Sequence, residues 1–242
     1  MIPLRDLNPT RRFPVITLVL IAANALIFLY EMSLSDRALY QLITSAGVVP
    51  YQVTHQLGPA VARDLITSMF LHGGWMHLLS NMLYLWIFGN NIEDVLGPVR
   101  YTVFYLLCGI LASLAQVLTS PNANAPTIGA SGAIAGVLGA YIVLFPRARV
   151  LSLVFVVYFI RFVEVPAIIV LGLWIVLQLF SGVAALNMST MGGVAYFAHI
   201  GGFVAGLILI FLFRAGRRTT PPRQRWSRRR NPFRDEYPDL WE

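Results

Sequence analysis

Residues 196–213 read YFAHIGGFVAGLILIFLF, eighteen residues without a charged side chain. A membrane-spanning helix needs about 20 predominantly apolar residues, so this stretch has the length and composition of one span. It also carries His199, and it carries Gly202 and Gly206 four residues apart on one helix face. The rest of the chain repeats this pattern of long uncharged segments with a few polar residues inside them.

Long uncharged segments dominate the composition of the chain. Of its 242 residues 57% are hydrophobic and 12% are charged, whereas soluble domains carry about 25% charged residues. The uncharged segments are 13–30, 65–92, 101–146 and 165–213. At about 20 residues for each span, the two shorter segments hold one helix each and the two longer ones hold two each. The sequence therefore predicts a polytopic membrane protein.

Turn-rich sequence divides each of the two longer segments. Residues 119–127 are rich in Ser, Pro and Asn, and residues 181–195 are rich in Gly, Ser, Thr and Asn, so both are predicted to be loops. The predicted fold is an all-α bundle of six transmembrane helices, over residues 13–31, 73–90, 100–118, 130–146, 166–181 and 196–213. The uncharged segment 150–160 is too short to span a membrane and is predicted to be interfacial or loop-like, with a seventh helix as the alternative.

The arginines indicate which side of the membrane each loop faces. The chain has no lysine, and 16 of its 18 arginines fall in the segments 1–12, 91–99 with the adjoining Arg100, 147–165 and 214–242. Because positively charged loops stay on the cytosolic side, both termini are predicted to be cytosolic. The predicted organisation is a cytosolic N-terminal segment, a six-helix membrane domain and a basic cytosolic tail, over residues 1–12, 13–213 and 214–242.

Three smaller features qualify this topology. The first span follows three arginines, as a signal peptide would, but its 18 apolar residues exceed a usual signal sequence, so we expect a retained helix. The basic tail predicts either contact with anionic lipid or a solvated segment that only fixes topology, and it shows no nucleic-acid-binding motif. Cys108 is the sole cysteine and lies in a predicted span, so no intramolecular disulfide can form.

The first polar cluster inside a span is HGGWMHLLSN, residues 72–81. His77 and Asn81 are four residues apart and therefore share one helix face, and His72 lies at the mouth of the span. Such a pair can donate hydrogen bonds to a developing negative charge. It can equally bind a neighbouring helix and hold the bundle together. The sequence leaves both interpretations open.

The second cluster is GASG, residues 129–132, at the start of the fourth predicted helix. The small residues Gly129 and Gly132 let another backbone approach the Ser131 hydroxyl, and the helix N-terminus offers free N–H groups to an oxyanion. The same small residues also form a common helix-packing pattern. Taken alone, this cluster favours packing.

The third cluster is AHIGGFVAG, residues 198–206, which contains His199. A buried histidine can be structural, a proton relay or a metal ligand, and the depth at which it lies in the membrane distinguishes these roles. The second, fourth and sixth helices run in the same direction, so His77, Ser131 and His199 lie within about 5–10 Å of one level, in the outer leaflet. The three clusters are therefore predicted to converge on one site.

A serine hydroxyl becomes a strong nucleophile when a neighbouring base takes its proton. His199 is the candidate base for Ser131, and the Ser131 backbone N–H, His77 and Asn81 are the candidate oxyanion hole. No acidic residue is expected at this depth, so the catalytic group would be a dyad, with the histidine held by packing and a polar neighbour. Gln116 and Gln178 are further polar residues in the spans.

From residue 65 to residue 206 the chain resembles the rhomboid family of intramembrane serine proteases. The resemblance rests on His-x4-His-x3-Asn in the second helix, Gly-x-Ser-Gly in the fourth and Ala-His-x2-Gly-x3-Gly in the sixth. It implies the six-helix rhomboid core and hydrolysis of peptide bonds in or near the transmembrane segment of a single-pass substrate. It implies no cofactor, metal or nucleic acid, and a multi-pass protein surrounded by lipid, predicted here to be in a bacterial plasma membrane. Structural or supporting roles follow for His72, Glu93, Gly129, Gly132, Gly202 and Gly206.

Three positions depart from the family pattern. Arg63 and Asp64 stand where many relatives carry Trp-Arg, and Ala135 stands where some bacterial members carry a tyrosine one turn after the serine. A ring that stacks on His199 must then come from elsewhere, and the candidates are Trp174, Tyr196 and Phe197.

Three other functions compete with a serine protease. A zinc protease would use His72, His77 and His199, but the chain lacks a His-Glu-x-x-His motif. A channel or transporter would need paired carboxylates or a coupling-ion site, which the sequence does not display. An inactive relative that only binds membrane helices would not need the intact serine and histidine.

Overall fold

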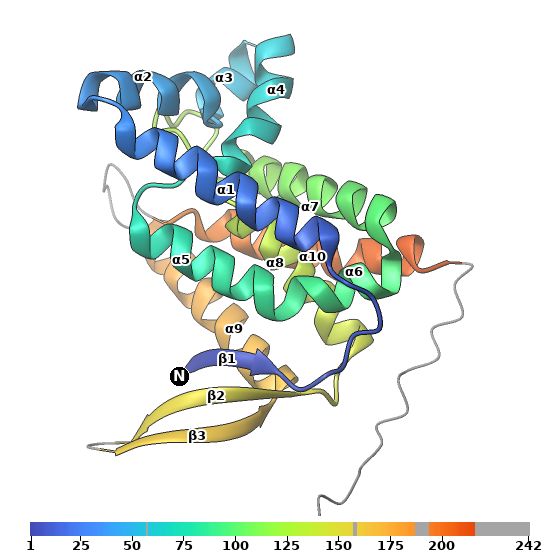
Figure 1. Cartoon of the computed structure of the whole chain (residues 1–242). Helices are drawn as coiled ribbons and strands as arrows, with labels where there is room; N and C mark the ends of the chain where they lie inside the picture. Colours follow the sequence, from blue (N-terminus) through green and yellow to red (C-terminus); the bar gives the residue numbers. More distant parts are fainter. Residues whose placement is uncertain (57, 157–158, 187–193, 216–242) are drawn as a thin grey trace, which may run out of the picture.

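Helices make up most of the described chain, and a small sheet lies at one margin of the bundle (Figure 1). The structure, a computed structural model, describes residues 1–56, 58–156, 159–186 and 194–215. Most of the predicted basic tail and the centre of the predicted 181–195 loop lie outside the described residues. The helices of the bundle are α1 (Val15–Ser33), α5 (Trp75–Tyr84), α6 (Asn90–Leu96), α7 (Pro98–Thr119), α8 (Ser131–Leu144), α9 (Ala167–Leu186) and α10 (Tyr196–Phe213).

These helices overlap the six predicted segments, but not all of them qualify as spans by themselves. The predicted end of the fifth segment is wrong, because α9 continues to Leu186, into the predicted 181–195 loop. Within the described residues, α1, α7, α9 and α10 are long and apolar enough to cross a membrane. Helix α8 has 14 residues, or about 21 Å, which is shorter than a hydrocarbon layer of about 30 Å. A π-helical turn, η2 (Leu85–Gly89), joins α5 to α6 in the segment predicted as the second span. The count of six spans therefore stays a prediction.

Helices α8 and α10 run parallel and touch through their glycines. A Cβ atom on Gly202 would collide with the carbonyl oxygen of Gly132, and one on Gly206 would collide with that of Gly136. The contacts advance by four residues along both helices, so the two helices point the same way. Only glycine allows the backbones to come this close, as the small-residue pattern predicts.

The α5–η2 segment runs in the same direction as α8. His77, near the start of α5, lies against Gly129, just before α8 begins. Further along both helices, the ring of Phe88 lies 4.9 Å from that of Tyr141. The starts of α5, α8 and α10 therefore lie together at one end of the bundle, as the common direction of the second, fourth and sixth predicted helices indicates.

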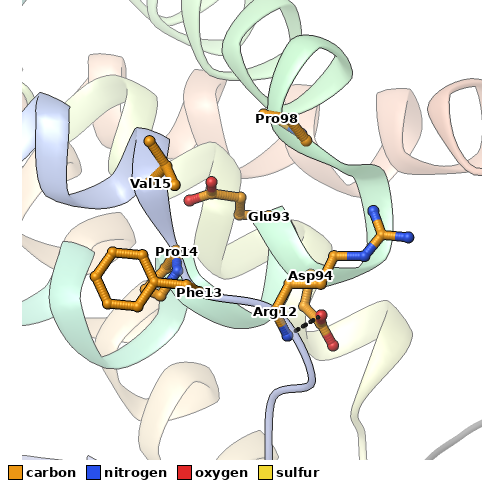
Figure 2. Close-up of a pocket in the computed structure, with 7 residues that line it drawn as sticks. All are labelled: Arg12, Phe13, Pro14, Val15, Glu93, Asp94 and Pro98. Carbon is orange, nitrogen blue, oxygen red and sulfur yellow. Dashed lines mark hydrogen bonds between the residues drawn. The ribbon is translucent and has the colours of Figure 1, made fainter.

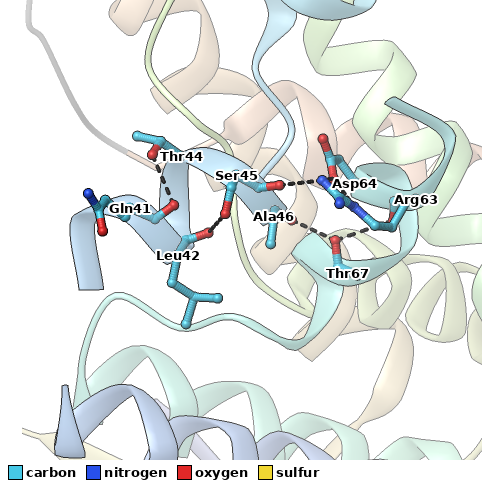
Figure 3. A network of polar contacts seen from close by, with 8 residues as sticks. All are labelled: Gln41, Leu42, Thr44, Ser45, Ala46, Arg63, Asp64 and Thr67. Carbon is cyan, nitrogen blue, oxygen red and sulfur yellow. Dashed lines mark hydrogen bonds and ion pairs between the residues drawn. The ribbon is translucent and has the colours of Figure 1, made fainter. Parts of the chain in front are cut away.

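The chain between α1 and α5 folds into short helices that the sequence analysis does not predict. They are α2 (Asp36–Ala46), α3 (Pro50–His55), α4 (Pro59–Thr67) and a 3-10 turn, η1 (Ser68–Phe70). Figure 3 shows how α4 is tied to α2: Arg63 donates to the Ser45 carbonyl at 2.6 Å, and Thr67 donates to the Ala46 carbonyl at 2.8 Å. Arg63 also pairs with Asp64 at 2.8 Å. Of the residues that depart from the family pattern, Arg63 therefore helps to join α4 to α2, and Asp64 pairs with Arg63 within α4.

The all-α prediction is wrong in one respect, because the fold includes a three-stranded antiparallel sheet in the order β1-β2-β3. Its strands are β1 (Ile2–Asp6), β2 (Arg149–Val156) and β3 (Phe159–Pro166). The segment 150–160, predicted to be interfacial or loop-like, lies mostly in β2 and at the start of β3. Its β-branched and aromatic residues favour strands, and a third strand from the N-terminus strengthens a hairpin that would be marginal alone.

Asp6 fastens this sheet to the helix bundle. Its carboxylate accepts hydrogen bonds from Asn91 Nδ2 at 2.7 Å and from the Tyr141 hydroxyl at 3.1 Å. Asn91 in turn accepts from Asn8 Nδ2 at 2.7 Å. Burial disfavours the charged form and raises the pKa of Asp6 from 3.8 to about 6, although these donors act in the opposite direction.

Two neighbouring acids hold the start of α1. The Glu93 carboxylate accepts from the Ile16 N–H, the Thr17 N–H and the Thr17 hydroxyl, each at 2.8 Å. Asp94 accepts from the Arg12 N–H at 3.0 Å, and both acids border an open hollow beside Pro98 (Figure 2). The first N–H groups of a helix lack partners within the helix and carry a partial positive charge, so a carboxylate there stabilises it.

Candidate active site

Ser131 and His199 meet where α8 and α10 begin. Ser131 is the first residue of α8, and His199 lies in the first turn of α10. The Nε2 atom of His199 lies 2.8 Å from the Ser131 hydroxyl oxygen, within hydrogen-bond distance. The neighbouring glycine contact fixes the two backbones that carry these side chains. The structure thus brings the predicted nucleophile and base together.

Helix α9 contacts the second nitrogen of the His199 ring. The Nδ1 atom of His199 lies 2.6 Å from the Gln178 amide oxygen. The ring of Trp174, one turn earlier on α9, lies 5.7 Å from the His199 ring at an angle of 36°. Trp174 is one of the three candidates named for this contact.

His77 approaches the serine segment through Gly129. The Gly73 N–H donates to His77 Nδ1 at 3.3 Å, so the neutral ring carries its proton on Nε2. A Cβ atom on Gly129 would lie 2.7 Å from Cε1 and Nε2 of this ring and 3.7 Å from the Ser131 hydroxyl oxygen. Gly129 also has a φ of +122°, which favours glycine. Both the space and the backbone conformation therefore require glycine beside the serine.

Asn81 lies one turn after His77 on the same helix and is 6% exposed. Its Nδ2 atom is buried and has no hydrogen-bond partner among the described residues. A buried amide without a partner is unusual and needs an explanation. A ligand that carries an acceptor would supply one.

His72 is buried behind His77, with the two rings 5.1 Å apart. Its backbone N–H lies 3.2 Å from both carboxylate oxygens of Glu31, at the end of α1. The prediction that no acidic residue lies at this depth is therefore wrong, because Glu31 reaches the backbone of His72. Among the described residues, however, the hydrogen-bond partners of the His199 ring are Ser131 and Gln178, and neither is an acid.

The remaining predicted residues divide into two groups. Gly132, Gly202 and Gly206 form the helix contact directly behind the serine and the histidine. Glu93 lies in α6 and accepts hydrogen bonds from the start of α1. It follows His77 by sixteen residues, which places it about 24 Å further along the chain at 1.5 Å per residue of helix. It supports the fold and does not touch the site.

Sequence reasoning left Gln178 and Glu31 without a role. The signal for Gln178 was present, because it is a polar residue in a predicted span and lies four residues after Trp174, on the same helix face. Its partner depends on how α9 is rotated in the bundle, which the sequence of α9 does not state.

Comparison with known proteins identifies the family of the chain. The chain matches the rhomboid domain over residues 59–216, more than half its length, and it belongs to the rhomboid family. It is 34% identical over 148 residues to RHOMBOID-like protein 5 of Arabidopsis thaliana, covering 61% of this chain and 43% of that protein. It is 34% identical over 153 residues to the mitochondrial Rhomboid protein 1 of Saccharomyces cerevisiae, covering 60% and 40%.

A bacterial relative is named as a protease. The chain is 35% identical over 144 residues to Rhomboid protease GluP of Bacillus subtilis, covering 59% of this chain and 24% of that protein. In all three comparisons the chain spans less than half the length of the relative. The similarity therefore covers only a part of each of these proteins.

Proposed function

We propose that this chain is an intramembrane serine endopeptidase that hydrolyses peptide bonds in or near the transmembrane segments of membrane proteins. The observation that carries the proposal is the 2.8 Å contact between His199 Nε2 and the Ser131 hydroxyl at the joined ends of two parallel helices. Membership of the rhomboid family and the name of the Bacillus relative support the same reaction class.

In the first chemical step, the Ser131 oxygen attacks the carbonyl carbon of the scissile bond while His199 Nε2 takes the hydroxyl proton. The carbonyl oxygen becomes an oxyanion as the new C–O bond forms. The imidazolium then gives its proton to the leaving nitrogen, the C–N bond breaks, and an acyl-enzyme remains. Water attacks this ester with the same histidine as base, which releases the acid and restores the serine.

The oxyanion needs donors aimed at one place. Three are proposed: the Ser131 backbone N–H, the His77 Nε2–H and the Asn81 Nδ2. The first belongs to a helix N-terminus, where N–H groups have no partner within the helix. The second follows from the Gly73 contact to the other ring nitrogen. The third is the buried amide without a partner.

The proposal extends to how the chain sits in the membrane. We take the α5–α6 segment and α8 as the second and fourth of six spans, in a membrane domain over residues 13–213. Both termini then lie in the cytosol, with the site toward the opposite face, and single-pass membrane proteins are the proposed substrates. The arginine distribution supports this orientation, and residues 1–12 and 214–242 would flank the domain on the cytosolic side.

A zinc protease is less compatible with the geometry than a serine protease. Both ring nitrogens of His199 are engaged, one with Ser131 and one with Gln178. A metal that used this histidine would have to displace one of the two contacts.

The proposal is tested by cleavage of a single-pass membrane protein by the purified chain in detergent, beside the Ser131→Ala and His199→Ala variants. We expect either substitution to lower kcat by about 10³-fold or more, as in other serine hydrolases. Activity that survives Ser131→Ala would refute the nucleophile. A wild-type chain that binds the substrate without cleaving it would point to an inactive relative.

A further inference from the structure

We propose that Gln178 is a positioning residue for His199, holding the ring in the form that accepts the Ser131 proton. The proposal rests on the proposed protease function and deepens it, because it assigns to an amide the task that a carboxylate performs in a Ser-His-Asp triad. The assignment comes from two contacts on one ring: Ser131 at Nε2 and Gln178 at Nδ1.

The first step concerns the proton of the neutral ring. A neutral imidazole carries one N–H, and a base for Ser131 must leave Nε2 unprotonated. The proton then sits on Nδ1, where it needs an acceptor. The Gln178 amide oxygen, at 2.6 Å from Nδ1, only accepts hydrogen bonds and so favours this tautomer.

The second step concerns the orientation of the ring. A histidine with one partner can rotate about that contact, whereas partners on both nitrogens fix the plane of the ring. The imidazolium formed during catalysis keeps its Nδ1–H, so the Gln178 contact persists and strengthens when the ring becomes charged. An acceptor at this place therefore helps the transition state more than the ground state.

The third step concerns what holds Gln178 itself. Trp174 and Gly182 lie four residues before and after it, on the same face of α9. The Trp174 ring lies against His199, and a Cβ atom on Gly182 would touch Tyr196 and Phe197 at the start of α10. This face of α9 is therefore packed on α10, and the base takes its orientation from a different helix than the one that carries it.

The test compares two substitutions at this position. Gln178→Met keeps the length and most of the volume of the side chain but removes the acceptor. Gln178→Glu keeps an acceptor oxygen and removes the amide nitrogen. If the acceptor is what matters, Gln178→Met lowers kcat about ten- to a hundredfold with KM nearly unchanged, and Gln178→Glu restores at least part of that loss.

Gln116→Met is the matched control. The Gln116 amide is also half-buried and also contacts the start of α10, but it accepts from the backbone N–H of Ala198 at 3.2 Å and not from the ring. We expect a similar loss of thermal stability for the two methionine variants. The kcat of Gln116→Met should stay within about threefold of the wild type, because a single backbone contact does not select the tautomer.

A second readout avoids the protein substrate altogether. The rate at which a fluorophosphonate labels Ser131 reports how strongly the histidine activates the serine. It should fall with Gln178→Met and recover with Gln178→Glu. Equal labelling rates and equal kcat values for wild type and Gln178→Met would overturn the positioning role, as would equal losses in Gln178→Met and Gln178→Glu.

The outcomes separate this inference from the proposed function. If the wild type cleaves substrate, Ser131→Ala does not, and Gln178→Met remains fully active, only the role of Gln178 fails. If Ser131→Ala still cleaves, the protease mechanism itself fails, whatever Gln178 does.

Discussion

The acids at the sheet end of the helix bundle and the Asn81 amide at its other end are all buried, but they differ in their hydrogen-bond partners. At the sheet end, Asp6 and Glu93 accept hydrogen bonds from defined donors, which fasten β1 and the start of α1. At the other end, the Asn81 amide nitrogen has no partner among the described residues. A satisfied network stabilises the fold, whereas a buried donor without a partner is available to a ligand. The predictions below test this difference.

The largest effect is expected for Asn81→Leu, which removes the donor without a partner and keeps a similar volume. Loss of one oxyanion donor lowers kcat by about 10²- to 10³-fold. Thermal stability should change little, because no described partner is lost. Cleavage kinetics and a melting curve measure the two quantities.

The control for Asn81→Leu is Ser80→Ala, whose hydroxyl donates to the His77 carbonyl of its own helix. We expect this variant to keep its kcat within about twofold, since it loses only a local bond. If Asn81→Leu keeps a normal kcat but has a much lower melting temperature, Asn81 stabilises the fold and does not act in the site. The contrast between the two ends would then be wrong.

Glu93→Ala tests the opposite end. It removes an acceptor of three hydrogen bonds at the start of α1, and we expect a loss of about 3 kcal/mol in the free energy of unfolding. Well below the melting temperature, kcat should be unchanged. Chemical or thermal unfolding in detergent measures the first quantity and substrate cleavage the second. If the Glu93→Ala variant is fully folded and yet loses kcat, Glu93 has a role in the site, and the distinction between the two ends of the bundle is wrong.

Asp6 makes the packing of β1 against the helix bundle depend on pH. Its pKa is about 6 in the folded protein and 3.8 in the reference state, so its contribution to stability is complete below about pH 4 and disappears as the pH rises through 6. Docking of β1 should therefore be weaker at pH 7 than at pH 5, by at most about 2 kcal/mol. Hydrogen exchange of residues 2–6, corrected for intrinsic rates, measures this, and Asp6→Asn should remove the dependence. Stronger protection at pH 7 would contradict the assigned burial effect.

The smallest effect is expected for Thr67→Val, which breaks one neutral hydrogen bond to the Ala46 carbonyl between α4 and α2. The expected loss of stability is about 1 kcal/mol, with kcat unchanged. A large fall in kcat would show that the short helices before α5 control the site, and a melting curve with a cleavage assay decides between the two results.

The bundle and the converging ends could be predicted because their signals are local. Residues 196–213 form a helix over the predicted range, and apolar length located the helix predicted over 130–146, which is α8. The predicted 181–195 loop begins too early, because α9 continues to Leu186. The direction of three helices followed from counting spans, and the glycine contacts agree with it. The meeting of His199 and Ser131 followed from that common direction.

The remaining features depend on contacts between distant residues. Asp6 in β1 pairs with Val150 in β2, far away in the sequence. A strand of only five residues, such as β1, gives no periodic signal in the sequence. The Gln178 contact requires the rotation of α9 about its own axis, which is set by packing on α10. The contact between Glu31 and the His72 N–H joins the end of α1 to the segment before α5, and the two residues are 41 positions apart.

The parallel contact of α8 and α10 also has a consequence for biosynthesis. Ser131 and His199 are 68 residues apart in the chain, so the serine enters the membrane before the helix with its base has been made. A serine without a base is an ordinary alcohol, and it gains reactivity only when Gly202 settles against Gly132. Under the proposed mechanism the unfinished chain therefore lacks protease activity, which requires that α10 has been made and has packed against α8.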